Sequence, residues 1–210
     1  MLNSIIKWDQ EVFLLLNGAG SEMYDAFWIF VSSTKSAIPL FLLIIFLLFK
    51  KHGTSFWQGL VLILVVVSLA DLSSVHCFKN VFMRLRPSHD PELADQIRLL
   101  VSKGGLYGFV SSHAANFFAL ATISSILLSN CKPVLLPFPI LGQYFIVKIN
   151  IVTYLPYILF SWATLVAYSR IYVGKHYLLD VIGGALLGFV VAKVIWHLVK
   201  KIKEKYTLAL

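Results

Sequence analysis

Long apolar runs that carry almost no charge constrain this chain more than any other feature of its sequence. Of its 210 residues, 59% are hydrophobic and only 13% are charged, whereas a soluble domain carries charge on about a quarter of its residues. Several runs approach the roughly 20 apolar residues that a helix needs to cross the hydrocarbon core of a bilayer. The sequence therefore predicts a single all-α membrane domain, a polytopic transmembrane helical bundle that occupies most of the chain.

The order of the apolar runs predicts about five spanning helices within residues 24–199. They cover approximately residues 24–49, 56–78, 113–129, 152–168 and 177–197. The first contains a polar break, "SSTKS", and closes on Lys50, Lys51 and His52. A basic tail, residues 200–210, follows the fifth helix and is expected to be cytoplasmic.

Residues 1–20 are predicted to form an amphipathic helix ahead of the first span. Its apolar stripe consists of Ile5, Ile6, Phe13, Leu14 and Leu15, and its polar stripe of Lys7, Asp9, Gln10 and Glu11. Because the segment is too short and too charged to cross a bilayer, we expect it to lie in the membrane interface. Its charges also argue against a cleavable signal peptide, so the first span is expected to direct insertion.

Residues 131–150 interrupt the helical pattern. Pro133, Pro137, Pro139 and Gly142 leave no uninterrupted run long enough for a spanning helix. A crossing here would also place the loop after the second span and the loop before the fifth on opposite faces of the membrane. We therefore expect an interfacial or re-entrant insertion.

The net charge of +8 bears on partners and on orientation. Lys50, Lys51 and the lysines of the tail mark one face as cytoplasmic by the positive-inside tendency. The opposite face carries nearly as many cations, so the positive-inside tendency determines the orientation only if those cations serve another purpose. Since the cations lie in short loops between spans, without interleaved aromatic residues, the expected partner is the lipid bilayer and not nucleic acid.

Three polar segments collect on that opposite face, in two loops at residues 79–113 and 169–180. They are "KNVFMRLRP", "GFVSSHAANFF" and "SRIYVGKHYLLD". Lys79, Arg86 and Arg170 bring three cations together, and arginine suits two-pronged contact with phosphate oxygens. Ser111 and Ser112 stand at a helix start, where free backbone N–H groups favour an anion. The pattern predicts a phosphate-binding pocket.

Two histidines and a carboxylate add chemistry to this pocket. His176 and Asp180 are four residues apart, so they share one face of a helix. The carboxylate can hold one imidazole nitrogen as N–H and leave the other free to attack. His113, from another span, can then protonate the leaving oxygen and later deprotonate water.

These segments resemble the signature of the type 2 phosphatidic acid phosphatase superfamily. That signature is Lys-six residues-Arg-Pro, then Pro-Ser-Gly-His, then Ser-Arg-five residues-His-three residues-Asp. The first and third parts match at every fixed position. The second keeps Ser111 and His113 but has Val110 in place of the proline and Ser112 in place of the glycine.

The resemblance implies a role for each matching residue. His176 would be the nucleophile, Asp180 its orienting acid and His113 the general acid and base. The implied phosphate ligands are Lys79, Arg86, Ser111, Ser112 and Arg170. No metal and no other cofactor is implied. The other loop cations, Arg84, Arg98, Lys103 and Lys175, lie outside the pattern and are expected to be solvated or to contact lipid headgroups.

We therefore expect a metal-independent lipid phosphatase of a bacterial inner membrane, with its site facing the periplasm and a phosphorylated lipid as substrate. Short members of the superfamily act on undecaprenyl diphosphate, lipid A phosphates or phosphatidylglycerol phosphate. The motifs contact phosphate and not the tail, so the choice stays open, with a preference for lipid A or the undecaprenyl carrier. The alternatives are a phosphatidylglycerophosphate or phosphatidic acid phosphatase, a non-catalytic phospholipid-binding or transport protein, and vanadate-dependent oxidation. The sequence leaves the oligomeric state open.

Overall fold

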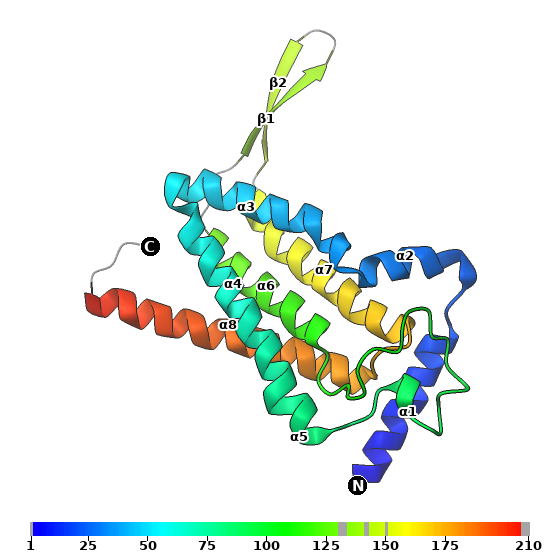
Figure 1. Ribbon diagram of the computed structural model, residues 1–210. Helices are drawn as coiled ribbons and strands as arrows, with labels where there is room; N and C mark the ends of the chain where they lie inside the picture. Colours follow the sequence, from blue (N-terminus) through cyan, green and yellow to red (C-terminus); the bar gives the residue numbers. More distant parts are fainter. Residues whose placement is uncertain (1, 130–133, 141–142, 150, 207–210) are drawn as a thin grey trace.

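A computed structural model describes residues 2–129, 134–140, 143–149 and 151–206 as a helical bundle with one small hairpin (Figure 1). The α-helices are α1 (Leu2–Gly18), α2 (Glu22–Ser32), α3 (Ile38–His52), α4 (Phe56–Ser73), α5 (Asn80–Phe82), α6 (Ser112–Leu128), α7 (Ile151–Tyr172) and α8 (Leu178–Tyr206). Short 3₁₀ turns lie at Thr34–Ala37, Gly53–Ser55 and Pro87–His89, and a π-helical turn, Ser74–Lys79, extends α4. The expected helical bundle is confirmed.

The first predicted span is broken into two helices, α2 and α3. The break lies at the polar "SSTKS" segment, where the Ser36 hydroxyl donates to the carbonyl oxygens of Val31 at 3.0 Å and Ser33 at 2.7 Å. Pro39 then stands in the first turn of α3, where its missing N–H is tolerated. Side-chain bonds to these carbonyls thus replace the helical ladder and allow the chain to bend.

Two continuous helical stretches, Thr34–Phe82 and Leu178–Tyr206, are long and apolar enough to cross a membrane, and Ser112–Leu128 is a shorter apolar helix. The first stretch turns sharply between α3 and α4 (Figure 1), at Gly53, whose φ of +58° favours glycine. These findings support a helical membrane protein. The number of crossings stays a prediction.

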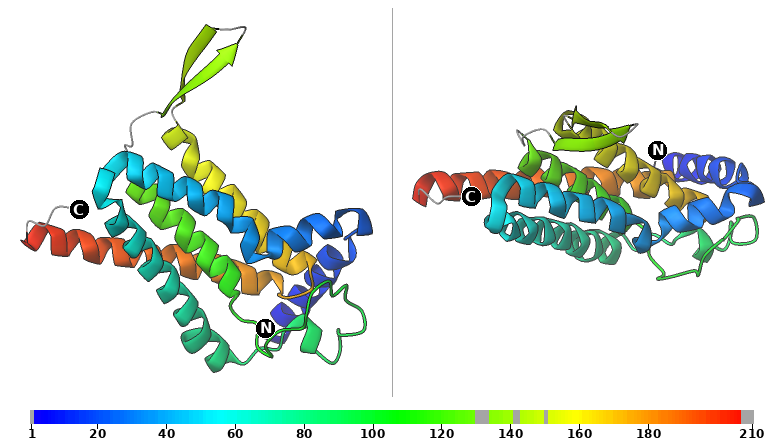
Figure 2. Two further views of the ribbon diagram at one scale, coloured as in Figure 1. Left: turned by 45° about the horizontal axis from the view of Figure 1, so that its top comes forward. Right: turned by 90° about the horizontal axis from the view of Figure 1, so that it is seen from above.

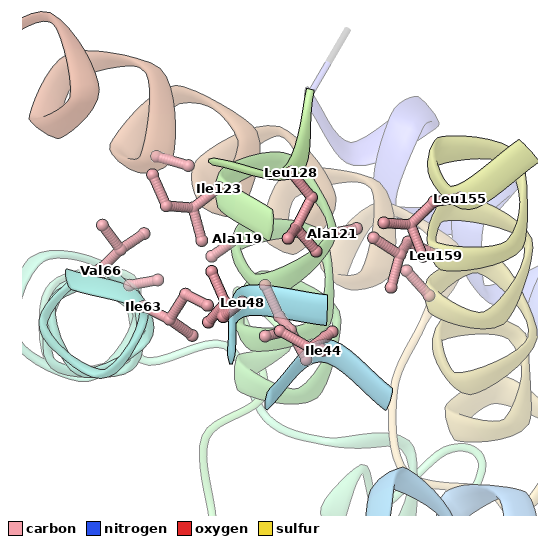
Figure 3. Packing of buried hydrophobic residues seen from close by; sticks show 14 of the residues in the cluster. Ile44, Leu48, Ile63, Val66, Ala119, Ala121, Ile123, Leu128, Leu155 and Leu159 are labelled. Carbon is pink, nitrogen blue, oxygen red and sulfur yellow. The ribbon is translucent and has the colours of Figure 1, made fainter. Parts of the chain in front are cut away.

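Helix α6 lies at the centre of the bundle and packs against α4, α7 and α8 (Figure 2). Its small and branched side chains, among them Ala119 and Ile123, meet Ile63 of α4 and Leu159 of α7 in a fully buried cluster (Figure 3). On the opposite side, glycines of α8 let the two backbones approach closely. A β-carbon on Gly188 would lie 2.0 Å from the carbonyl oxygen of Ala115.

Replacing Gly188 with alanine should therefore destabilise the bundle. The clash is with backbone, which cannot rotate away, so we expect a loss of about 1–3 kcal/mol in the free energy of unfolding. The measurement is the midpoint of thermal unfolding in detergent. Gly18→Ala is the matched control, because a β-carbon there meets no atom within 4 Å. Equal midpoints for the two variants would show that α6 and α8 are not packed this tightly.

Helix α1 is amphipathic, but the prediction of its two stripes was partly wrong. Asp9, assigned to the polar stripe, is fully buried together with Phe13, while Ile5 and Leu15 of the apolar stripe are exposed. The physical reason is that Asp9 has an ionic partner in the loop after α5, so its burial is compensated. Whether α1 lies in the membrane interface remains a prediction.

Residues 134–140 and 143–149 depart from the all-helical expectation, and the rest of the predicted insertion at 131–150 lies outside the described residues. Strands β1 (Val134–Ile140) and β2 (Gln143–Ile149) pair antiparallel, with Val134 opposite Ile149 and Ile140 opposite Gln143. The hairpin projects from the end of the bundle where α6 ends and α7 begins (Figure 1). Prolines exclude a helix here, as expected, and its relation to the membrane stays a prediction. At the C-terminus, α8 continues to Tyr206, so the start of the predicted basic tail is helical, while residues 207–210 lie outside the described residues.

Candidate active site

The three predicted segments meet at one end of the bundle, away from the hairpin (Figure 1). Lys79 ends the π-helical turn after α4, His113 lies in the first turn of α6, and Arg170 lies in the last turn of α7. His176 lies two residues before the start of α8, and Asp180 lies in the first turn of that helix. His113 is within electrostatic range of Arg170, His176, Lys79 and Arg86. All three segments therefore contribute to one cluster.

His176 and Asp180 form an oriented pair. Nδ1 of His176 lies 3.3 Å from Oδ2 of Asp180, and both residues are buried. The same carboxylate oxygen accepts a hydrogen bond from the backbone N–H of Tyr177 at 3.1 Å. With Nδ1 engaged by the carboxylate, the other ring nitrogen, Nε2, is the one left for chemistry. Burial, followed by Arg86 and Arg170, lowers the pKa of His176 well below the ordinary imidazole value, so its ring stays neutral.

Arg170 carries the clearest sign that an anion belongs here. One of its terminal nitrogens donates to the backbone oxygen and to the hydroxyl of Ser32 in α2. Its Nε is buried and has no hydrogen-bond partner within the described part of the chain. A buried guanidinium N–H that is left unpaired is costly. An oxyanion bound beside it would supply the missing acceptor.

Arg86 and Lys175 converge on the loop before α6. A β-carbon on Gly104 would lie 3.2 Å from Nη1 of Arg86 and 2.6 Å from Nζ of Lys175, so both cations reach this glycine. Lys175 is only 6% exposed, and burial together with Arg86 and Arg170 lowers its pKa from 10.5 to about 8. The expectation of a solvated Lys175 was therefore wrong. Its position directly before His176 was the signal that could have identified it.

The start of α6 holds the second motif. Ser111 is the N-cap, and its hydroxyl accepts a long hydrogen bond, 3.5 Å, from the backbone N–H of Ala114. The hydroxyl of Ser112 lies 2.6 Å from that of Ser74 and accepts a hydrogen bond from Lys79. Ser112, which replaces the glycine of the signature, thus adds a hydroxyl that contacts a cation of the cluster.

Arg84 was also assigned wrongly as a solvated loop cation. Its Nη1 donates to Oδ1 of Asp180 at 3.0 Å, and its Nη2 lies 2.7 Å from Oδ2 of Asp9. The guanidinium stacks 4.1 Å from the ring centroid of Tyr177. Arg84 therefore connects Asp9 of α1 to Asp180 of α8.

Residues 58–204 match the PAP2 superfamily. The chain belongs to the PAP2 superfamily.

Two relatives and two solved structures agree with this assignment. The lipid A 4'-phosphatase of Porphyromonas gingivalis is 30% identical over 91% of this chain and 73% of its own length. That of Bacteroides thetaiotaomicron is 27% identical over 90% of this chain and 75% of its own length. Aquifex aeolicus LpxE has a TM-score of 0.58 at 26% identity and covers 90% of this chain and 94% of its own. A transmembrane PAP2 type phosphatidylglycerolphosphate phosphatase from Bacillus subtilis has a TM-score of 0.69 at 21% identity and covers 96% of this chain and 89% of its own. At this low identity, the similarity supports the fold alone.

The resemblance seen in the sequence is thus confirmed, and this PAP2 protein is a membrane lipid phosphatase, a hydrolase. Among the described residues, no group of three or more histidine, cysteine or acidic side chains is arranged to hold a metal ion. Ser32 and Asp9 were missed because they lie in segments outside the three motifs, and the match to the family begins only at residue 58.

Proposed function

We propose that this PAP2 phosphatase removes the 4'-phosphate of lipid A by way of a phosphohistidine. The observation that carries the proposal is the unpaired, buried Nε of Arg170, which lies in a cluster of cations around an oriented imidazole. The choice of lipid is supported by the two lipid A 4'-phosphatases that match nine-tenths of this chain.

In the proposed complex, Arg170, Arg86 and Lys79 hold the phosphate oxygens, and the start of α6 at Ser111 and Ser112 adds hydrogen-bond donors. Lys175 is a further phosphate ligand, since it reaches Gly104 beside Arg86. These groups are fixed before substrate arrives, so they stabilise the charge that develops on the equatorial oxygens in the transition state.

The chemistry then takes two steps. Nε2 of His176 attacks phosphorus, the bond from phosphorus to the sugar oxygen breaks, and His113 gives that oxygen a proton. Next, His113 takes a proton from water, and the water oxygen attacks the phosphohistidine. The P–N bond breaks, its electron pair returns to His176, and inorganic phosphate leaves. Asp180 holds the Nδ1 proton throughout.

The proposed topology has five crossings, with the site at the periplasmic face of a bacterial inner membrane and the end of α8 in the cytoplasm. The lysines near the end of α8 support this orientation by the positive-inside tendency, because most cations on the other face have another role. Arg84 and Arg98 form ion pairs with acids, and Lys79, Arg86, Arg170 and Lys175 surround the proposed phosphate site. Reporter fusions in the loop 83–111 and at the C-terminus should report different compartments.

A lipid panel tests the substrate. Purified protein in mixed micelles is offered lipid A with phosphates at positions 1 and 4', undecaprenyl diphosphate, phosphatidylglycerol phosphate and phosphatidic acid. We expect the fastest phosphate release from lipid A, with mass spectrometry showing loss at position 4'. Faster release from another lipid, or loss from position 1, would overturn the assignment. His176→Ala measures the background.

The pH dependence of kcat/KM should be bell-shaped. Because the pKa of His176 is lowered, its ring stays neutral on the acid side, and the phosphate ester, whose second pKa is about 6, should limit the rate there. On the alkaline side, Lys175 loses its proton as pH rises through about 8 and phosphate affinity falls. Lys175→Arg, which stays charged, should move the alkaline limb to higher pH. An unmoved limb would mean that another group, such as His113, sets it.

A further inference from the structure

We propose that Asp9 of α1 is a positioning residue, which holds the orienting acid Asp180 in place through Arg84. The inference rests on the proposed role of Asp180. It makes the N-terminal helix, which lies outside the residues matched to the family, a working part of the active site.

Arg84 bridges helices α1 and α8. One guanidinium contacts two carboxylates from two different helices, Asp9 at 2.7 Å and Asp180 at 3.0 Å. Both carboxylates are 0% exposed, and the side chain of Arg84 is 20% exposed. Two buried acids that share one cation depend on it, because removing one member of such a group leaves an uncompensated buried charge.

The two carboxylate oxygens of Asp180 have different partners. Oδ2 faces His176 and the N–H of Tyr177, while Oδ1 faces Arg84. Arg84 therefore fixes the rotation of the carboxylate that orients the nucleophile. A carboxylate free to rotate would present Oδ2 to His176 for only part of the time.

Asp9 of α1 contacts both Arg84 and the start of α8. The second oxygen of Asp9, Oδ1, accepts a hydrogen bond of 3.0 Å from the backbone N–H of Leu179, the residue before Asp180. Burial raises the pKa of Asp9, and the Leu179 N–H and Arg84 oppose that rise. Asp9 thus holds both the side chain that contacts Asp180 and the backbone that carries it.

The same helix braces the ring beneath Arg84. The hydroxyl of Tyr177 donates to Oδ2 of Asp90 at 2.8 Å, and Gln10 of α1 donates to the same oxygen at 3.0 Å. Since the guanidinium of Arg84 lies over the Tyr177 ring, neighbouring residues of α1 support it from two sides. These contacts connect α1 to Arg84 both directly, through Asp9, and indirectly, through Gln10, Asp90 and Tyr177.

Asp9→Asn tests the inference, with Glu11→Gln as the matched control, an exposed acid two positions further along α1. Asp9→Asn keeps the shape and an acceptor for Leu179 but loses the ion pair. Because Asp9 touches neither phosphate nor the imidazole, we expect kcat per folded molecule to fall, up to about 10²-fold, with KM unchanged. Glu11→Gln should match the wild type. An unaltered kcat in Asp9→Asn would overturn the inference.

A double-mutant cycle separates positioning from general support of the fold. If Asp9 acts through Arg84, then Asp9→Asn should lower kcat little further in an Arg84→Gln background. Additive losses would overturn the inference. If Asp9→Asn does not fold, Arg84→Lys provides the test, since it keeps the charge and loses the two-pronged contact. An unchanged kcat in Arg84→Lys would then overturn the inference.

The failure of this inference can be distinguished from failure of the proposed function. If the wild-type protein releases phosphate from no lipid, the proposed function fails. If only Asp9→Asn and Arg84→Lys behave as wild type while Asp180→Asn is inactive, this inference alone fails.

Discussion

Replacing His176 with alanine should abolish phosphate release, with a loss on the order of 10⁴- to 10⁶-fold, the range found when a covalent nucleophile is removed. His176 supplies the atom that bonds to phosphorus, and no other imidazole within the described residues is held by a buried carboxylate in this way. Lipid binding should persist, because the cations that grip phosphate remain. The variant therefore separates chemistry from binding.

The measurement is phosphate release from lipid A together with trapping of labelled phosphate on the protein after rapid acid-free denaturation. Wild-type protein should carry label and His176→Ala none. His197→Ala is the matched control, because this exposed histidine lies far along α8 from the cluster. Label on His176→Ala, or equal release by both proteins, would remove His176 from the proposed role and favour a non-catalytic lipid-binding protein.

The features that could be predicted from the sequence depend on local patterns. Helices α6 and α8 each begin within one residue of their predicted starts. Ser111 caps α6, and the acidic Asp180 lies in the first turn of α8. The pairing of His176 with Asp180 was expected from their spacing of four residues, and it forms although His176 lies just before α8 and not within it. Such features need no knowledge of which distant segment packs where.

The features that were missed depend on contacts between distant residues. Arg170 donates to Ser32, 138 residues away, and Arg84 donates to Asp180, 96 residues away. A charged residue such as Asp9 looks solvent-facing in isolation, since burial of a carboxylate is costly unless a partner arrives. Only the fold supplies that partner. For the same reason, the sequence did not distinguish the loop cations Arg84 and Lys175, which lie beside the cluster, from the loop cations Arg98 and Lys103.

Replacing Asp180 with asparagine should lower kcat by about 10³- to 10⁴-fold while the protein still folds. Asparagine has the same shape, but it cannot hold the Nδ1 proton of His176 as a charged acceptor, and its amide can instead donate to Nδ1. The imidazole would then carry its proton on Nε2, the nitrogen that must attack. In a serine protease triad, the same change of an orienting aspartate costs about 10⁴-fold for this reason.

Folding should survive Asp180→Asn because Arg84 keeps Asp9 as its ionic partner. KM should change little, since the hydrogen bonds of Asp180 go to His176, the Tyr177 N–H and Arg84, and none goes to a proposed phosphate ligand. The measurement is kcat at saturating lipid A, with thermal unfolding in detergent beside it and Asp95→Asn, an exposed acid of the loop, as control. A kcat within about tenfold of wild type would mean that the carboxylate does not select the reactive tautomer. The bridge from Asp9 through Arg84 would then stabilise the fold without serving catalysis.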